Sequence, residues 1–215
     1  MNFFKINISK SIILLIALSV VLNILRILIW NKVSFVYILW NIFLALLPFI
    51  ISSLLLRANN IKKLNQTIFL IGGIFWLILI PNSPYIITDL IHIGEVRAVP
   101  ALYDSFLLFS SAWVGLLLGM YSINHMEQIL ITKYSKKMTS IVLVFVILFT
   151  SFGMYLGRFL RFNSWDVFAK PISFLNGIRE IFTSNHNLTE ALLYTILFFF
   201  FILISYLSWK STQTK

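Results

Sequence analysis

The most regular feature of the chain is a series of long apolar runs separated by short polar segments. An α-helix needs about 20 residues to cross a bilayer. Runs of that length lie near residues 11–30, 35–56, 64–80, 101–122, 138–158 and 190–209. The pattern therefore predicts an all-α fold, a polytopic membrane helix bundle with about six transmembrane helices.

One polar stretch, Pro81–Gly94, interrupts the apolar pattern abruptly. Its polar and ionisable residues are spaced by three, one, three and three positions, which places them on one face of an α-helix: Tyr85, Thr88, Asp89, His92 and Glu95. Ser83 suits an N-cap, Pro84 the first helical position and Gly94 a C-terminal stop. We therefore expect an amphipathic α-helix with an ionisable stripe.

A second amphipathic pattern follows Lys170 and Pro171. Its apolar residues recur at helical spacing: Ile172, Leu175, Ile178 and Phe182. This spacing is typical of a helix lying in the membrane interface. Together with Pro81–Gly94 it predicts one or two interfacial amphipathic helices on the extracytoplasmic side. The last membrane helix is then expected to start at Thr189 and Glu190.

Composition agrees with a membrane protein and excludes several other classes. The 215 residues are 60% hydrophobic and 11% charged, which leaves no soluble domain of useful size and favours a single transmembrane domain, residues 1–215. The chain has no Cys, which excludes disulfides, thiolate catalysis and Cys-ligated metal centres. The net charge of +10 does not indicate nucleic-acid binding, because the Lys and Arg residues are scattered through short inter-helix segments.

The Lys and Arg residues of these segments predict the orientation. With a cytoplasmic N-terminus, ten fall inside (Lys5, Lys10, Arg57, Lys62, Lys63, Lys133, Lys136, Lys137, Lys210, Lys215) and six outside (Lys32, Arg97, Arg158, Arg161, Lys170, Arg179). Cytoplasmic segments carry the excess of basic residues. We therefore expect a multi-pass protein of the bacterial cytoplasmic (inner) membrane, with both termini cytoplasmic and Pro81–Gly94 outside.

Ionisable side chains from several segments reach the outer level in this topology. Arg158 and Arg161 lie three positions apart at the end of the fifth helix, and such a pair could clamp an anionic ligand such as a lipid phosphate. The candidate ligand-binding residues are Asn82, Tyr85, Thr88, Asp104, Arg158, Arg161, Asn163, Trp165 and Asp166. The alternative is that the arginines pair with Asp166, Asp104 or Asp89 and join helices, or meet lipid headgroups.

Asp89 and His92 are the candidate catalytic residues. Their three-residue spacing suits an acid–base pair or half of a metal site. The alternative is a solvated interfacial face, and one His with carboxylates is too weak a signature to predict a metal. For Asn163 and Asp166 the alternative to a ligand role is a local one, an N-cap and its reciprocal partner three positions on.

Small residues four positions apart mark helix-packing faces. The fourth helix carries Ser111, Gly115 and Gly119, and the fifth carries Gly153 and Gly157. Small residues let helix backbones approach closely in lipid. Their partners lie either within the chain or in a second copy, so a homo-oligomer is one of the expected arrangements.

The motif residues together resemble a family of uncharacterised bacterial membrane proteins, the domain of unknown function 1361. The resemblance lies in Pro81-Asn82-Ser83-Pro84-Tyr85, Thr88-Asp89, His92, Tyr103-Asp104, Gly157-Arg158, Arg161 and Asn163-Ser164-Trp165-Asp166. It implies a multi-pass integral membrane protein. It implies no established substrate, cofactor or catalytic residue.

Two functional hypotheses follow from these residues. In the first, the outer polar cluster binds or processes an anionic or lipid-linked ligand, so the expected partners are membrane lipid and a lipid phosphate, without nucleic acid. In the second, the protein is a non-catalytic membrane scaffold or small transport component whose charges pair between helices. Whether the protein is an enzyme, and whether it takes a cofactor, stays open at this stage.

Overall fold

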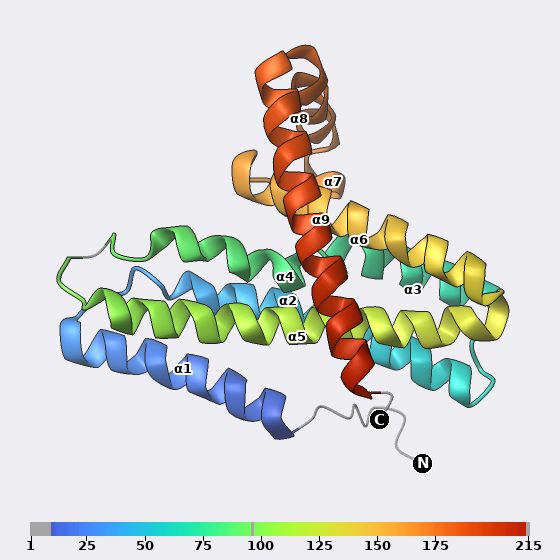
Figure 1. Cartoon of the computed structure of the whole chain (residues 1–215), viewed down its shortest axis with the longest axis horizontal. Helices are drawn as coiled ribbons and strands as arrows, with labels where there is room; N and C mark the ends of the chain where they lie inside the picture. The colour runs from blue at the N-terminus through green and yellow to red at the C-terminus, as the bar shows by residue number, and fades with distance from the viewer. Residues whose placement is uncertain (1–9, 96, 214–215) are drawn as a thin grey trace. The chain divides into compact units, whose positions relative to one another are not determined.

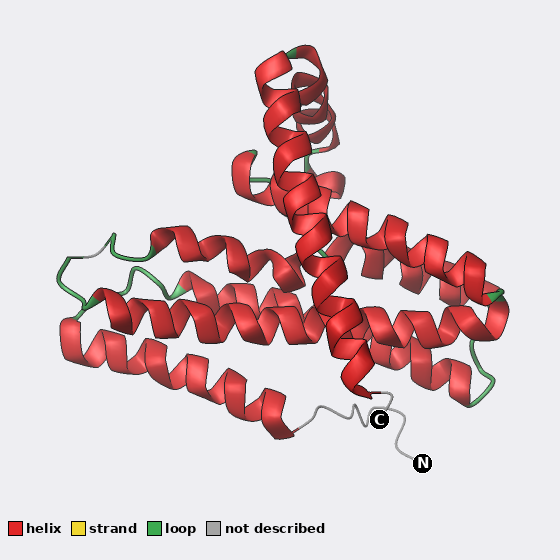
Figure 2. Ribbon diagram, in the orientation of Figure 1, coloured by secondary structure: helices red, strands yellow, loops and turns green. Residues whose placement is uncertain are grey.

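A computed structural model describes residues 10–95 and 97–213 and shows only helices and their connections in them (Figures 1 and 2). The helices are α1 (Lys10–Trp30), α2 (Tyr37–Asn60), α3 (Gln66–Leu79), α4 (Asn82–Tyr85), the 3₁₀-helix η1 (Ile86–His92), α5 (Ala101–Lys133), α6 (Lys136–Phe159), α7 (Asp166–Ala169), α8 (Pro171–Thr183) and α9 (Asn185–Gln213). Lys5 and Lys215, counted above for the orientation, lie outside the described residues.

Six helical stretches are long and apolar enough to cross a membrane, which confirms the predicted fold class. They are α1, α2, the continuous run Gln66–His92, α5, α6 and α9. The start of α9 is four residues earlier than expected, because Ser184 caps it: its side-chain oxygen accepts from the backbone N–H of Asn187 at 3.4 Å.

The chain divides into two compact units, a first unit of Met1–Ile129 and a second unit of Leu130–Lys215. The first unit contains α1 to η1 and most of α5, and the second contains α6 to α9. A single transmembrane domain stays a prediction.

The core of the first unit lies among α1, α2, η1 and α5. Ile38 and Ala45 of α2 and Leu107 of α5 are fully enclosed in it. Helix α3 packs closely on α2 at Gly72, where an added Cβ would lie 2.8 Å from a methyl carbon of Leu55. This close approach follows the small-residue packing of helices in lipid.

The core of the second unit lies where α6, α8 and α9 meet. Tyr155 and Leu156 near the end of α6 pack with Ile181 of α8 and Ala191 of α9. Figure 1 shows α8 beside the first turns of α9. This packing holds the turn that follows α6, which carries Arg161 and Asn163.

Candidate functional site

The polar stretch Pro81–Gly94 is not the single α-helix that its spacing predicted. It consists of the short α4 and then the 3₁₀-helix η1, and Ser83 does not cap it. The Ser83 hydroxyl instead donates to the carbonyl oxygen of Ala45 on α2 at 3.0 Å. Gly94 does end the helical stretch, with a φ of +81° that favours glycine.

The 3₁₀ geometry divides the expected ionisable stripe. Residues three apart in a 3₁₀-helix lie directly in line, so Asp89 and His92 share a line with Ile86. Thr88 lies on a different line and donates its hydroxyl to the carbonyl of Tyr85 at 2.8 Å. The predicted neighbours Asp89 and His92 therefore lie on one side, and Thr88 and Tyr85 on another.

Asp89 is buried and bonded to a side chain that the sequence pattern did not single out. Its carboxylate is 1% exposed and accepts a hydrogen bond from the Asn41 side-chain amide at 3.0 Å. Asn41 lies on α2 inside an apolar run. A polar residue within a membrane span signals a polar partner at its depth, and that signal could have linked it to Asp89.

His92 is joined to Glu95. His92 Nδ1 lies 2.7 Å from Glu95 Oε1, and the ring meets Tyr37 edge-on at 6.4 Å between centroids. The carboxylate thus holds the orientation of the imidazole, as in acid–base sites. Among residues 10–95 and 97–213, no three His, Cys, Asp or Glu side chains are grouped to hold a metal ion.

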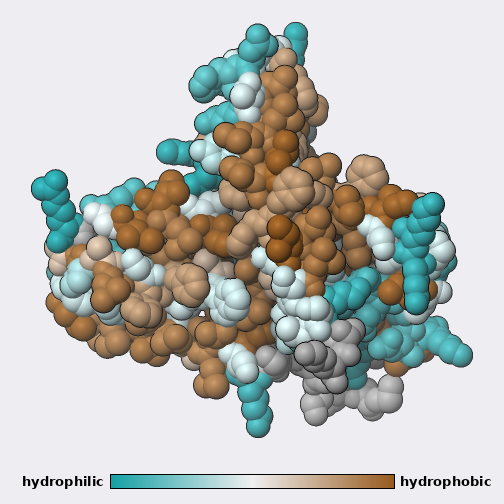
Figure 3. All heavy atoms as spheres, in the orientation of Figure 1, coloured by the Kyte–Doolittle hydropathy of each residue, from teal (hydrophilic) through white to brown (hydrophobic). Residues whose placement is uncertain are grey.

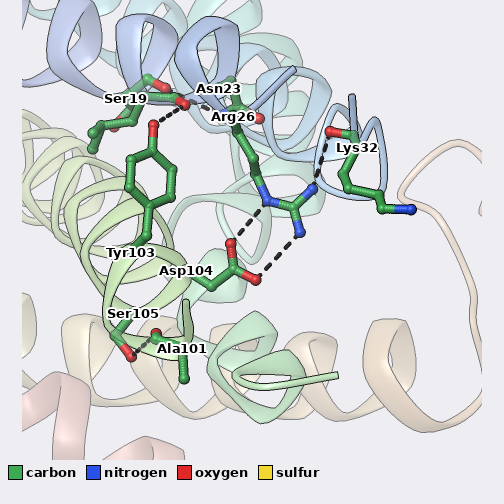
Figure 4. Close-up of polar contacts among 9 residues, drawn as sticks. Ser19, Asn23, Arg26, Lys32, Ala101, Tyr103, Asp104 and Ser105 are labelled. Atoms are coloured by element: carbon green, nitrogen blue, oxygen red, sulfur yellow. Dashed lines mark hydrogen bonds and ion pairs between the residues drawn. The ribbon is translucent and has the colours of Figure 1, made fainter. Parts of the chain in front are cut away.

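Asp104, another predicted ligand residue, forms a buried ion pair with Arg26 of α1 (Figure 4). Arg26 Nε and Nη2 donate to the two carboxylate oxygens at 2.8 and 3.2 Å, and Nη1 donates to the carbonyl of Lys32 at 3.1 Å. The guanidinium also lies 4.2 Å from the Phe35 ring centroid. Arg26 and Asp104 are 1% and 0% exposed, so this pair is internal to the first unit.

Further polar contacts accompany the pair between α1 and α5. The Tyr103 hydroxyl donates to the carbonyl of Leu22 at 2.6 Å (Figure 4). About two helical turns from the ion pair, the hydroxyls of Ser19 and Ser110 lie 3.5 Å apart. Helices in lipid associate through such packing and hydrogen bonds, so these contacts attach α1 to α5.

The small-residue face of α5 has its partner within the chain. A Cβ at Gly115 would overlap the carbonyl oxygen of Ser83, and one at Gly119 would lie 3.2 Å from the Ser83 Cβ. Ser83 is therefore held between α5 and the carbonyl of Ala45 on α2. This arrangement accounts physically for a small residue at Gly115 and a serine at position 83.

A second polar network, not predicted, joins α2, α3 and α5 in the first unit. It consists of Ser52, Ser53, Trp76, Ser122 and His125. The Trp76 indole donates to the Ser122 hydroxyl at 2.7 Å, which in turn donates to Ser52 at 3.0 Å. Ser52 and Ser53 lie 3.2 and 3.3 Å from His125 Nδ1. Ser122 and His125 lie three positions apart on α5, but their contacts with Ser52 and Ser53 depend on the packing of α5 on α2, which neither helix alone reveals.

Replacing Ser122 with alanine should lower the unfolding free energy by about 1–3 kcal/mol, because a buried indole N–H loses its acceptor. Trp76 is 2% exposed, so water does not easily replace the hydroxyl. Thermal unfolding in detergent measures the change. Ser105→Ala is the matched control, since that exposed hydroxyl bonds only the carbonyl of Ala101 in its own helix. Equal melting of the two variants would contradict the role given to Ser122.

In the second unit, α6 ends in a sharp turn that displays Arg161. The N–H groups of Leu160 and Phe162 both donate to the carbonyl of Leu156, at 3.2 and 3.3 Å. Arg161 between them has a φ of +56°, in the left-handed region. Its side chain is exposed and has no hydrogen-bonding or ionic partner within the described part of the chain. Arg158, three positions earlier, is half-buried.

Asp166 has the local role that was the alternative to ligand binding. Its carboxylate accepts from the backbone N–H of Asn163 at 2.7 Å and from the Asn163 amide at 3.4 Å. This is the reciprocal contact of a helix start, although Trp165 rather than Asn163 is the N-cap of α7. Asp166 is 6% exposed, whereas Trp165 and Asn163 are exposed.

The candidate residues are thus distributed over the two units. Asn82, Tyr85, Thr88, Asp89, His92 and Asp104 belong to the first unit, and Arg158, Arg161, Asn163, Trp165 and Asp166 belong to the second. The site roles of these residues stay predictions.

Six apolar helices with charged and polar groups paired inside them define a multi-pass integral membrane protein. The chain belongs to the family described as protein of unknown function (DUF1361), whose model matches residues 40–205. This range begins in α2 and ends in α9, so it covers the motifs of both units. No curated protein and no solved structure matches the chain.

Proposed function

We propose that this protein binds an anionic ligand, the phosphate group of a lipid or lipid-linked compound, at the turn that follows α6. The observation that carries the proposal is the exposed guanidinium of Arg161, which has no partner among the described residues. A planar guanidinium presents hydrogen-bond donors in a geometry that matches phosphate oxygens. Helix ends of membrane spans lie near the headgroup level, where such phosphates are found.

The charges around the turn favour an anion. Asp166, the nearest carboxylate along the chain, is occupied by Asn163. Arg158 adds a second guanidinium three positions before Arg161, at the end of a membrane helix. The exposed ring of Trp165 suits the membrane–water interface, where amphipathic rings concentrate.

The orientation is part of the proposal. The distribution of Lys and Arg residues favours cytoplasmic termini, which places the turn after α6 at the extracytoplasmic face of a bacterial cytoplasmic membrane. The proposal concerns binding. The acid–base roles of Asp89 and His92 stay predictions, and each of these residues has its own contact, to Asn41 and Glu95 respectively.

Replacing Arg161 with asparagine tests the proposal without damaging the turn. Asparagine tolerates the left-handed backbone, so the substitution removes the guanidinium and keeps the conformation. We expect the Kd for phosphatidylglycerol, measured on the detergent-solubilised protein, to rise about ten-fold. A hydrogen bond to a charged group contributes about 1.5 kcal/mol or more, and about 1.4 kcal/mol corresponds to a ten-fold change in Kd. Titration with the lipid, followed by native mass spectrometry or by the rise in melting temperature, measures the change.

Lys62→Asn is the matched control. Lys62 is also an exposed basic residue with a left-handed backbone after a membrane helix, with a φ of +57°. Phosphatidylcholine and inorganic phosphate are titrated in parallel: binding of inorganic phosphate alone identifies a free anion as the ligand. Equal weakening in both variants, or no weakening in Arg161→Asn, would sink the proposal.

A specific observation also favours the second hypothesis, a scaffold with internally paired charges. The ion pair between Arg26 and Asp104 is enclosed completely, so these two charges hold α1 to α5 and are inaccessible to a ligand. In this function the first unit is a rigid membrane frame. Thermal unfolding of the Asp104→Asn variant tests this hypothesis.

A further inference from the structure

Helix α8 and the start of α9 form a helical hairpin. Only Ser184 separates the two helices, so the chain reverses its direction within a residue or two. Phe174, Ile178 and Ile181 on one side of α8 pack with Leu188, Ala191 and Tyr194 of α9 and with the end of α6. The hairpin therefore has a packed inner side, and Ile178, which was expected in the membrane interface, belongs to it.

The exposed surface of α8 divides into an apolar and a polar side. Ile172, Leu175 and Phe182 are 76%, 63% and 65% exposed, and helical spacing places Arg179 beside them. We call this the lipid side of α8. Ser173 and Glu180 lie on the polar side, about a third of a turn away, and are also exposed.

The two ends of the hairpin differ in polarity. Its tip, residues 183–187, reads Thr-Ser-Asn-His-Asn. Beyond the tip α9 exposes Leu192, Leu193, Ile196 and Leu197. Figure 3 shows hydrophilic side chains at the tip and hydrophobic side chains along α9 below it. This gradient indicates that the tip lies in water and that the apolar end lies in the bilayer.

We infer that the α8–α9 hairpin stands at the bilayer surface with the lipid side of α8 against phospholipid. The inner side of α8 packs on α9, which is long and apolar enough to cross the membrane, so α8 is held beside a membrane span while its lipid side stays exposed. At 1.5 Å per residue, the 13 residues of α8 extend about 20 Å, too short to span the hydrocarbon core of about 30 Å. Arg179 on the same side can extend its guanidinium to a phospholipid phosphate while its stem lies along apolar side chains.

The hairpin differs from a helix lying flat in the interface. Because α8 runs antiparallel to the start of a membrane span, depth changes along it. Ile172, far from the tip, lies deepest on the lipid side, Leu175 is next, and Phe182 beside the tip lies nearest to water. A flat helix would hold all three at one depth.

Single-cysteine variants test the inference cleanly, because the chain has no Cys. Ile172→Cys, Leu175→Cys and Phe182→Cys carry a nitroxide label on the lipid side, and Ser173→Cys and Glu180→Cys carry it on the polar side as matched controls. All five residues are exposed, so the labels should leave the fold and the melting temperature unchanged.

The labelled full-length protein is placed in phosphatidylglycerol–phosphatidylcholine bilayers, and collision rates with oxygen and with a water-soluble nickel complex are measured. We expect the oxygen-to-nickel ratio at positions 172 and 175 to exceed that at 173 and 180 several-fold, and to fall from 172 through 175 to 182.

High nickel accessibility at all five positions places the hairpin in water, and low accessibility to both reagents on the lipid side indicates a protein partner such as a second copy. Equal depth at 172, 175 and 182 indicates a flat helix, and each of these three results overturns the inference. None depends on whether Arg161 binds a phosphate.

Discussion

Replacing Asp104 with asparagine should lower the unfolding free energy of the protein by about 3–5 kcal/mol, the usual cost of removing one partner from a buried ion pair. The amide keeps the shape of the carboxylate but not its charge. Arg26, 1% exposed, then retains a positive charge without a counter-ion in the interior of the first unit. Thermal unfolding in detergent measures the loss.

Two further variants separate charge from packing. Glu180→Gln removes an exposed carboxylate and should leave the melting temperature unchanged. The double variant Arg26→Met with Asp104→Leu replaces both charges by apolar groups and should recover most of the stability lost in Asp104→Asn, since buried ion pairs exchange for apolar side chains at little cost. If Asp104→Asn melts at the wild-type temperature, the ion pair does not stabilise the protein, and the scaffold hypothesis is contradicted.

Replacing Gly115 with alanine should destabilise the protein by about 3 kcal/mol, the upper end for an overpacked core. The new methyl group overlaps the carbonyl oxygen of Ser83, which is backbone and is held in place by the bond from the Ser83 hydroxyl to Ala45. Either α5 separates from α4 or that hydrogen bond breaks. The melting temperature in detergent reports the effect.

Two other glycines provide graded controls. Gly73 on α3 has nothing within 4 Å of an added Cβ, so Gly73→Ala should leave stability unchanged or raise it by about 0.5–1 kcal/mol through helix propensity. Gly119→Ala, whose Cβ would lie 3.2 Å from the Ser83 Cβ, should be intermediate. If Gly115→Ala behaves like Gly73→Ala, the close approach of α5 to Ser83 is not a source of stability.

Most of the helix architecture could be predicted from the sequence because bilayer thickness imposes a length on every span. The six apolar runs correspond to the six candidate membrane helices. The start of α8 at Pro171 was also readable, since proline suits the first turn of a helix. The start of α9 could not be predicted in this way, because Ser184 and Thr189 are both acceptable N-caps and the packing of α9 on α8 decides between them.

The contacts of the candidate residues were less predictable, because they depend on which helices are neighbours. Asp104 was expected at the outer level of the membrane, but only the packing of α1 on α5 makes Arg26 its partner. Ser83 suits an N-cap by residue type, but Pro81 stands at that position, before α4. The Ser83 hydroxyl donates to the carbonyl of Ala45 on α2 instead. Asn41 is a visible polar residue in an apolar run, but the sequence does not single out Asp89 as its partner.

The ion pair also has a consequence for the synthesis of the protein. Arg26 and Asp104 are 78 residues apart, and at about 5–20 residues per second a ribosome needs about 4–16 s to make the chain between them. During that interval Arg26 has no Asp104 to pair with. A nascent chain that stops before α5 never acquires this carboxylate, so the buried ion pair forms only after α5 has been made.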